Sequence, residues 1–372
     1  MPTLSNALQI GLSGLKANQM GLNVTGHNIS NVNNEGYTRQ SLVMESKSPI
    51  QVLKKIFGTG VDVTEVRRYR ESFVDRQFRE QNQRLGNLAK QSKSLDLVEG
   101  ILNEPSDTGL HNAIKNFFNS LQDLSVNPES SSVRTTVREE GRSLSRIFNQ
   151  TNNQLESIRH GKNFEITDTV TKVNQIMDQI GLLNVEIGQI EALGRQANDM
   201  RDSRDQLLDK LSKLVDITAV EDPANSTIIV SISGIAMVVM GDVNHLEAES
   251  VSEQGKEYIK VTNPLDDQPM KISGGELAGL FEIRDKILPE LIEDIDKLAG
   301  AMITEINSVH RQGYGLKGNR SYVPTDIDFF QGENAGDMAL SYEISSDPGN
   351  IATSKSGAPG DNENALALAQ LR

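Results

Sequence analysis

The sequence predicts a mainly α-helical protein: an elongated antiparallel helical bundle with long, coiled-coil-like helices, a small inserted antiparallel β domain, and an N-terminal amphipathic helix that becomes ordered on assembly. Three observations lead to this class. Apolar residues recur at helical spacing through most of the chain, β-branched runs gather in one island, and only 4% of the 372 residues are aromatic, with no Trp. Such a composition suits extended helical bundles better than a single thick globule.

The first thirty residues place leucines along one face of a predicted helix. These leucines are spaced by four, four, three and seven residues: Leu4, Leu8, Leu12, Leu15 and Leu22. A second, narrower row of small residues contains Gly11, Gly14 and Gly21. Each glycine costs a helix about 1 kcal/mol relative to alanine, so the row predicts that another helix approaches closely. An isolated helix of this kind is unstable in water, and we expect it to fold by packing against partners.

The residues that follow this helix are open to two interpretations. Asn28, Asn31, Asn33 and Gly36 can simply end the helix, as asparagine and glycine often do. They can also belong to a contact between subunits. Both interpretations can hold together, because the turn decides where the side chains of residues 37 and 39 point.

Residues 41–70 change character. Val61, Val63 and Val66 alternate with polar residues, which predicts a short strand or hairpin. The basic cluster at residues 67–70 is a single patch in an acidic protein, so it is a weak signal for nucleic acid. We expect it to contact an acidic neighbouring subunit instead.

Four helices are predicted next, over residues 71–103, 109–125, 132–160 and 164–192. Pro105 ends the first because proline cannot continue a helix, and Pro128 with the serines after it forms a turn with capping residues. The last has the most regular apolar seam of the chain, spaced by three and four: Val173, Ile176, Ile180, Leu183, Ile187 and Ile190. An antiparallel bundle within one chain explains this seam better than a free dimeric coiled coil, since short connections favour antiparallel neighbours.

The rest of the chain is predicted to be helix, a β island and helix again. Alternating charges at residues 201–210 indicate solvated ion pairs on a helix. Residues 216–273 hold short β-branched runs separated by turns at 223–225, 234, 241–242 and 254–255, which predicts a small antiparallel domain. Helix returns from Gly275 to about Arg311, where Pro289 either starts a second helix or kinks one long helix. A further helix opens after Gly360.

Charge and composition exclude several classes of function. The net charge of −14 argues against nucleic acid and anionic lipid as main partners. The absence of Cys excludes disulfides, zinc–thiolate sites and cysteine nucleophiles. No apolar run reaches the roughly 20 residues that span a bilayer, so we expect no membrane insertion. The five His show no metal-ligand spacing, and no phosphate loop or Gly-x-Ser-x-Gly turn is present, so we expect no enzyme, cofactor or metal.

Several short motifs carry a resemblance to a known family. They are residues 12–17, then Asn28, Ile29, Asn31, Asn33 and the run Gly36-Tyr37-Thr38-Arg39-Gln40, followed by residues 58–63. This pattern resembles the N-terminal signature of the flagellar rod, hook and hook-associated axial proteins. The charged segment at 201–211 and the sequence Asp328-Phe329-Phe330 also resemble that family.

The resemblance implies a structural subunit at the hook–filament junction of the bacterial flagellum. Implied partners are copies of the chain in a ring, the hook protein below, the next junction protein above, the export apparatus and an export chaperone. Because the N-terminus lacks the pattern of a cleaved signal peptide, the implied route is flagellar type III export to an extracellular flagellum. The implied subunit-contact residues are Leu4, Leu8, Leu12, Gly14, Leu15, Leu22, Asn28, Ile29, Asn31, Asn33, Gly36, Tyr37 and Arg39.

The expected domain organisation has three parts. Residues 1–60 form an N-terminal assembly segment, which the resemblance pairs with a C-terminal helix that does not follow here. Residues 61–215 and 274–372 form a discontinuous helical bundle, and residues 216–273 form the small β domain.

Three alternatives remain open at this stage. Another axial subunit of the rod or hook shares the opening motif, although the helices predicted from 71 to 215 are unexpected there. A non-flagellar secreted coiled-coil adhesin or effector leaves residues 36–40 unexplained. A soluble signalling helical bundle is weaker still, because the β island interrupts it.

Overall fold

The computed structural model describes residues 4–52, 55–102, 109–222, 225–253, 256–263, 265, 267–317, 321–324 and 326–372. The fold is mainly α-helical with small antiparallel sheets, which confirms the predicted class. The chain forms two compact units. Unit 1 comprises Met1–Ala89 and Ile166–Gly279, and unit 2 comprises Lys90–Glu165 and Leu280–Arg372.

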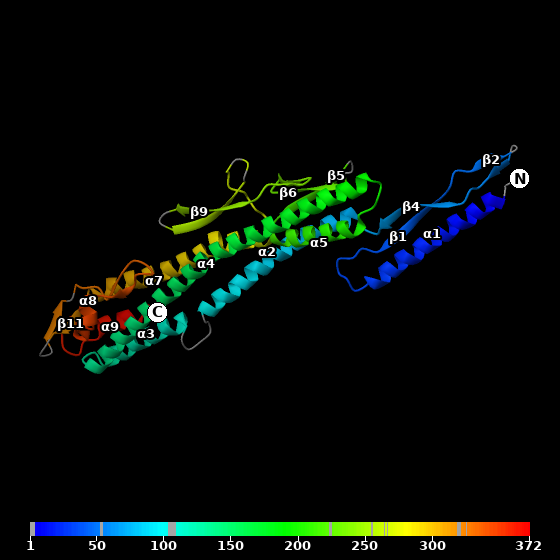
Figure 1. Ribbon diagram of the computed structural model, residues 1–372. Coiled ribbons are helices and arrows are strands. Elements are labelled where there is room, and N and C mark those ends of the chain that lie inside the picture. Colours follow the sequence, from blue (N-terminus) through cyan, green and yellow to red (C-terminus); the bar gives the residue numbers. More distant parts are fainter. Residues whose placement is uncertain are drawn as a thin grey trace. The chain divides into compact units, whose positions relative to one another are not determined.

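Unit 1 begins with a helix and a long β-hairpin. The elements are α1 (Leu4–Ser30), β1 (Gln40–Ser46), β2 (Ile50–Val52), β3 (Lys55–Phe57) and β4 (Val61–Arg68). β1 pairs antiparallel with β4 from Gln40 opposite Arg68 to Ser46 opposite Val61, and β2 pairs with β3. Helix α1 lies beside β1 and β4 (Figure 1). The predicted N-terminal helix and the predicted hairpin are therefore both present.

The second part of unit 1 contains the β island and a short helix, α5 (Asn198–Leu214). The strands are β5 (Ile217–Asp222), β6 (Thr227–Ile232), β7 (Ile235–Val239), β8 (Asp242–Val243), β9 (Glu247–Glu253) and β10 (Lys256–Thr262). The first four form one antiparallel sheet in chain order, and the last two form a hairpin. This is the small antiparallel domain that the sequence predicts. The predicted turn residues 223–224 and 254–255 lie outside the described residues.

Two long helices, α2 (Ser72–Leu102) and α4 (Ser131–Ala192), contribute residues to both units. The sequence predicted two helices over 132–160 and 164–192, and this division is wrong because α4 is continuous over 62 residues. The junction offers only Gly161 as a helix breaker, which costs about 1 kcal/mol and is not enough to end a helix. Lys162 is buried there and pairs with Glu165 at 2.7 Å, one turn further along the same helix.

Unit 2 is built on α3 (Leu110–Val126) and on the helical run α6 (Gly275–Glu282), η1 (Ile283–Ile287) and α7 (Leu288–His310), whose first residues belong to unit 1. Pro289 lies in the first turn of α7, directly after the π-helical segment η1. Residues 275–310 are helical without a break, since Glu282, Ile287 and Leu288, at the two ends of the π-helical segment, all have αR backbone angles. The structure thus favours the second of the two alternatives for Pro289, one long helix, with a π-helical turn directly before the proline. Such a turn departs from the regular helical hydrogen-bond ladder, which a proline cannot continue because it lacks an N–H. Pro105, the predicted end of α2, lies outside the described residues.

Short elements complete unit 2. They are β11 (Tyr314–Lys317), β12 (Ser321–Pro324), β13 (Phe330–Gln331), β14 (Ala339–Leu340), α8 (Tyr342–Ser346), the 3-10 helix η2 (Pro348–Asn350) and α9 (Glu363–Ala369). The last of these is the helix that the sequence predicts after Gly360.

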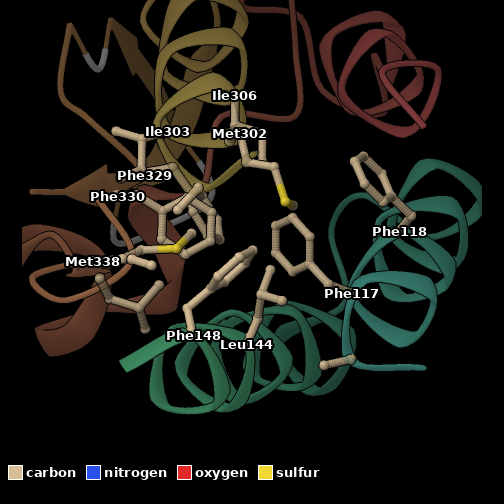
Figure 2. Packing of buried hydrophobic residues seen from close by; sticks show 14 of the residues in the cluster. Phe117, Phe118, Leu144, Phe148, Met302, Ile303, Ile306, Phe329, Phe330 and Met338 are labelled. Carbon is tan, nitrogen blue, oxygen red and sulfur yellow. The ribbon is translucent and has the colours of Figure 1, made fainter. Parts of the chain in front are cut away.

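The core of unit 2 is aromatic. Phe117 from α3 lies with its ring centroid 5.6 Å from that of Phe329 and 5.5 Å from that of Phe330. Leu144 and Phe148 of α4 and residues of α7 surround these rings (Figure 2). All of the labelled aromatic side chains are buried, so the double Phe is a packing element of this unit.

Two rows of apolar residues at helical spacing are less buried than that spacing suggests. On α2, Phe78, Leu85 and Leu88 are 52%, 57% and 63% exposed, although Val98 is buried. On α7, Leu298 is 42% exposed, while Ile295 and Met302, one turn away on either side, are buried. Helical periodicity identifies a face but does not say whether this chain covers it.

Candidate subunit-contact surface

One side of α1 is a row of exposed large apolar side chains. Leu4, Leu8, Leu12, Leu15, Leu22 and Ile29 are between 49% and 88% exposed. At 100° per residue these six positions fall within a sector of about 100° on the helix. We call this sector the leucine face. Within the described residues no part of the chain buries it.

The opposite side of α1 packs on the β1–β4 hairpin. Ala17 is 4% exposed, and the backbone N–H of Val61 donates to Ser13 Oγ at 3.2 Å. Gly21 lies against Leu42, 3.7 Å from where a Cβ would stand. A Cβ at Gly14, by contrast, would meet no atom from another described part of the chain within 4 Å. The expected close approach of a second helix to Gly14 is therefore not made within the described part of this chain.

The turn after α1 is held by Asn28. Its Nδ2 donates to Gln40 O at 2.9 Å, and its Oδ1 accepts from Gln40 N at 2.9 Å and from the Tyr37 hydroxyl at 2.8 Å. The Tyr37 hydroxyl also lies 3.1 Å from His27 Nδ1. Burial raises the pKa of Tyr37, and the carboxylates of Asp199 and Asp202 raise it further. Asn28 and Tyr37 thus form a clasp that fixes β1 to the end of α1.

The other candidate residues of this turn have different surroundings. Asn31 Nδ2 donates to the His27 carbonyl at 3.0 Å, which caps the helix, and Asn33 is exposed. The Arg39 guanidinium lies over the Tyr69 ring, 5.4 Å from its centroid. Gly36 lies directly against the side chain of Gln206, so the absence of a side chain makes room for α5. Asn31 therefore supports the helix-ending interpretation, while Gly36 contributes to contact with another element.

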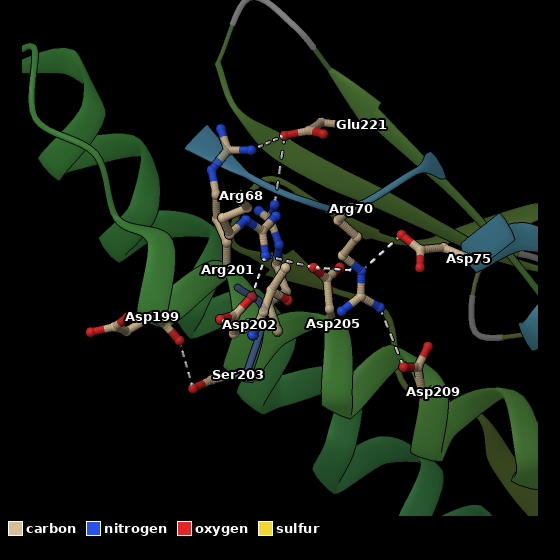
Figure 3. Close-up of polar contacts among 12 residues, drawn as sticks. Arg68, Arg70, Asp75, Asp199, Arg201, Asp202, Ser203, Asp205, Asp209 and Glu221 are labelled. Carbon is tan, nitrogen blue, oxygen red and sulfur yellow. Dashed lines mark hydrogen bonds and ion pairs between the residues drawn. The ribbon is translucent and has the colours of Figure 1, made fainter. Parts of the chain in front are cut away.

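Carboxylates of α5 bind arginines from β4, from α2 and from the segment between them. Figure 3 shows Arg68 and Arg70 beside Asp202, Asp205 and Asp209. Arg68 Nη1 donates to Asp202 Oδ1 at 2.7 Å and to Asp205 Oδ2 at 2.9 Å. Arg79 Nε donates to Asp209 Oδ1 at 2.9 Å, and its Nη2 lies 3.3 Å from Asp205. Asp202, Asp205 and Arg79 are all less than 10% exposed. The expectation of solvated ion pairs at 201–210 is therefore wrong for these residues.

The basic cluster at residues 67–70 is also corrected by this network. Arg70 Nε pairs with Asp75 at 2.8 Å, and its Nη2 lies 3.4 Å from Asp209. Arg68 and Arg70 find their acidic partners within the chain, not on a neighbouring subunit. The sequence held a signal that could have revealed this, because Asp202, Asp205 and Asp209 follow at spacings of three and four and share one helical face.

A second group of charges ties α5 to the end of α4 and to the β island. Arg201 donates to both Glu191 carboxylate oxygens at 2.7 and 2.6 Å and to Glu221 at 2.7 Å. Burial alone would raise the pKa of Glu191, but the hydrogen bonds from Arg201 outweigh it and lower that pKa to about 2. Arg204 is 1% exposed and donates to Asn184 Oδ1 and Ser226 O, both at 2.9 Å. Burial lowers the pKa of Arg204 to about 10.

Neither a membrane span nor a metal centre emerges from the described part of the chain. None of its helices combines the length and apolar character needed to cross a membrane. Over the same residues no three His, Asp or Glu side chains come together in a way that could hold a metal ion.

Comparisons with known proteins agree on one family. Residues 95–330, more than half of the chain, match the family described as "Flagellar hook-associated protein FlgK helical domain". Residues 8–38 match the family described as "Flagella basal body rod protein".

Similar proteins include three that are named flagellar hook-associated protein 1. The protein from Bacillus subtilis (strain 168) is 31% identical over 98% of this chain and 79% of its own length. That from Escherichia coli (strain K12) is 26% identical over 94% of this chain and 66% of its own length. That from Salmonella typhimurium is 27% identical over 85% of this chain, which spans only 58% of that relative.

A solved structure shows the same fold. The flagellar hook junction protein FlgK from Burkholderia pseudomallei aligns with a TM-score of 0.56 and 24% identity over 68% of this chain and 46% of that one.

Proposed function

The chain belongs to the flagellar hook-associated protein 1 family, and from this premise we propose that copies of it assemble into the ring that joins the hook to the filament. The family is one of structural flagellar subunits and not of enzymes. The match over residues 95–330 favours a hook-associated protein over a rod or hook subunit. The match over residues 8–38 does not separate these alternatives, because it is to a family of rod proteins.

The leucine face of α1 is the observation that supports this proposal. A leucine side chain that moves from water into a packed contact contributes about 1.5–3 kcal/mol. Six exposed apolar side chains on one helix face therefore form a contact that gains its free energy only when a neighbour covers it. Each subunit would offer this face to a different surface of the next, and such heterologous contacts build rings or helical arrays.

Ordering of the first half of α1 would be coupled to this contact. Ala17 is the only buried residue of the 27 in the helix, so residues 4–16 have little packing within the chain to offset the entropy of ordering their backbone. The packing of Ala17 and the clasp at Asn28 and Tyr37 hold the second half of α1 beside the hairpin. We propose that order spreads from Ala17 toward Leu4 as neighbouring subunits cover the leucine face.

The candidate contact residues divide between two roles in this proposal. The six apolar side chains, with Gly14 beside them, would form the contact between subunits. Asn28, Asn31, Gly36 and Tyr37 would set the turn out of the helix, and Asn33 and Arg39 would lie at the edge of the contact. The domain boundaries expected from the sequence also remain a proposal.

Finer partners and the route out of the cell belong to the same proposal. The ring would sit on the hook protein and seat the next junction protein. The subunit would leave the cell through the flagellar type III export apparatus, aided by an export chaperone and without a cleaved signal peptide. It would then function outside the cell as part of the flagellum.

A gene deletion with complementation tests the proposal. Cells without the gene are expected to make hooks that lack filaments and to release flagellin into the medium. Wild-type chain should restore filaments, whereas a chain with Leu8→Gln, Leu15→Gln and Leu22→Gln should not. Lys16→Gln is the matched control, because it changes an exposed residue on the same helix outside the leucine face. Normal flagella in the deletion strain, or full rescue by the triple variant, contradict the proposal.

A further inference from the structure

Two motifs that lie far apart in the sequence, residues 36–40 and the charged segment at 201–211, are in contact in the structure. The segment at residues 36–40 contacts α5 through Thr38, whose backbone N–H donates to Asp202 Oδ2 at 2.9 Å. Gln40 Nε2 donates to Asp199 Oδ1 at 3.2 Å. These contacts join residues about 160 apart in sequence. They lie outside the leucine face.

A second strand is attached to the same helix and to the turn before it. The carbonyl and N–H of Val66 in β4 bond to Asn198 Nδ2 at 2.7 Å and Gln196 Oε1 at 2.6 Å. Two residues further on, Arg68 reaches Asp202 and Asp205. Because Gln40 pairs with Arg68 in the hairpin register, both attachments lie at the same end of the β1–β4 hairpin.

We infer that Asp202 and Asp205 are positioning residues, which act through Arg68 and Thr38 to fix the direction in which α1 presents its leucine face. The inference rests on the proposed function and identifies the part of unit 1 that aims the contact. We call this set of contacts between the hairpin end and α5 the joint.

The chemistry of the joint suits a positioning role. Apolar contacts are non-directional, so an apolar attachment would let the hairpin slide or rotate. Charge-assisted hydrogen bonds are short and angle-dependent. Asp202 and Asp205, 4% and 6% exposed, bind Arg68 of β4 and the backbone N–H of Thr38, two residues before β1, and such a two-point attachment resists rotation. Helix α1 follows the hairpin because the Asn28 clasp and the packing of Ala17 hold it there.

The joint also has a consequence for the order of events. Among the described residues, the acidic partners of Arg68 are Asp202 and Asp205 of α5, more than 130 residues later in the chain. During export from the N-terminus, residues 4–68 would therefore stay unanchored until α5 has left the cell and folded. The leucine face is thus presented in a fixed direction only by a completed unit 1.

A distance measurement between two spin labels tests the inference on the full chain, which has no Cys of its own. Labels at Lys16→Cys on α1 and Gln175→Cys on α4 are both on exposed positions. The unaltered joint should give a single narrow distance distribution. Asp202→Asn with Asp205→Asn keeps the side-chain shapes but removes both charges, and the narrow distribution should be lost. Asp168→Asn is the matched control, since it removes an exposed carboxylate paired with Lys172 and should leave the distribution narrow.

Folding and assembly are read alongside the distance. If circular dichroism shows that the double Asn variant loses helix, a second variant, Arg68→Gln with Asp202→Asn, takes its place. It removes one charge of each sign, so it should keep its helix and still lose the narrow distance distribution. In cells, either variant should yield hooks without filaments. A narrow distribution in the folded variants overturns the inference, and so does a broad distribution in a variant that still joins filaments normally. Normal flagella in the deletion strain would instead contradict the proposed function and leave the distance test of the joint standing.

Discussion

The stability of unit 2 should depend on the protonation of one buried histidine, His310. This residue ends α7 and is fully buried. The N–H of Ala352 donates to its Nε2 at 2.9 Å, so that nitrogen must be unprotonated, and Nδ1 donates to the Ile327 carbonyl at 2.9 Å. The ring of Phe329 packs edge-on against it. Protonation of Nε2 would remove the acceptor for Ala352 and place a charge inside the core.

The expected magnitude follows from the pKa of His310. Burial is the main cause that lowers it from 6.5 to about 4; the charge of Arg134 acts in the same direction, while the Ile327 carbonyl and Asp328 act in the opposite one. The folded chain keeps this residue neutral below pH 6.5, where the unfolded chain binds a proton. Stability is therefore complete above pH 6.5 and falls as the pH drops from 6.5 toward 4. The total loss is about 3 kcal/mol, of which about 2 kcal/mol is lost by pH 5.

Amide hydrogen exchange across residues 301–310, corrected for intrinsic rates, measures this loss locally. His310→Gln is the matching variant, because an amide can donate to Ile327 and accept from Ala352 without titrating. Wild-type protection should fall relative to that of the variant between pH 7 and pH 5. His160→Gln, an exposed histidine of the same unit, should show no such difference from wild type. Equal pH dependence in wild type and His310→Gln would refute the argument.

Three further predictions concern packing. Leu8→Gln should change monomer stability by less than about 0.5 kcal/mol because the side chain is 74% exposed. Ala17→Gln should cost about 1–3 kcal/mol because it overfills the contact with the hairpin. Chemical unfolding of both variants compares the leucine face of α1 with its packed face. Phe117→Ala should destabilise unit 2 by about 3–5 kcal/mol, measured by thermal unfolding, and a cost below 1 kcal/mol would show that the aromatic cluster is not its core. Arg134→Met should cost about 3 kcal/mol, because it leaves three backbone carbonyls and Thr353 Oγ1 without their donor, and an unchanged melting temperature would contradict this.

Much of the fold can be predicted because the local signals agree with the final structure. The leucine spacing predicts α1, the alternating valines predict β4, and the β-branched runs predict the β island. On α3, apolar residues at helical spacing form the buried face, since Phe117, Phe118 and Leu121 are all buried. In these segments, periodicity and tertiary packing lead to the same answer.

Other features depend on contacts that no local pattern reveals. The sequence predicts separate helices over 132–160 and 164–192, but α4 runs through this junction, because the stability of a long helix outweighs the cost of the one glycine there, Gly161. The arginines at 68 and 70 looked like a surface patch because the α5 carboxylates that pair with them lie more than 130 residues away in the sequence. The apolar row of α2 was also not predictable in one respect. Its side chains, such as Leu88, are exposed, because helical spacing does not reveal whether the same chain covers an apolar row.

The account depends most on the leucine face being open in the free subunit and covered in the ring. A maleimide label on Leu15→Cys measures this directly, since the chain has no other cysteine and Leu15 is 67% exposed. Ala17→Cys, on the packed side of α1, provides the comparison and should label slowly in both states. The account predicts rapid labelling of position 15 in the monomer and protection in isolated flagella. Equal labelling of position 15 in the two states would contradict it.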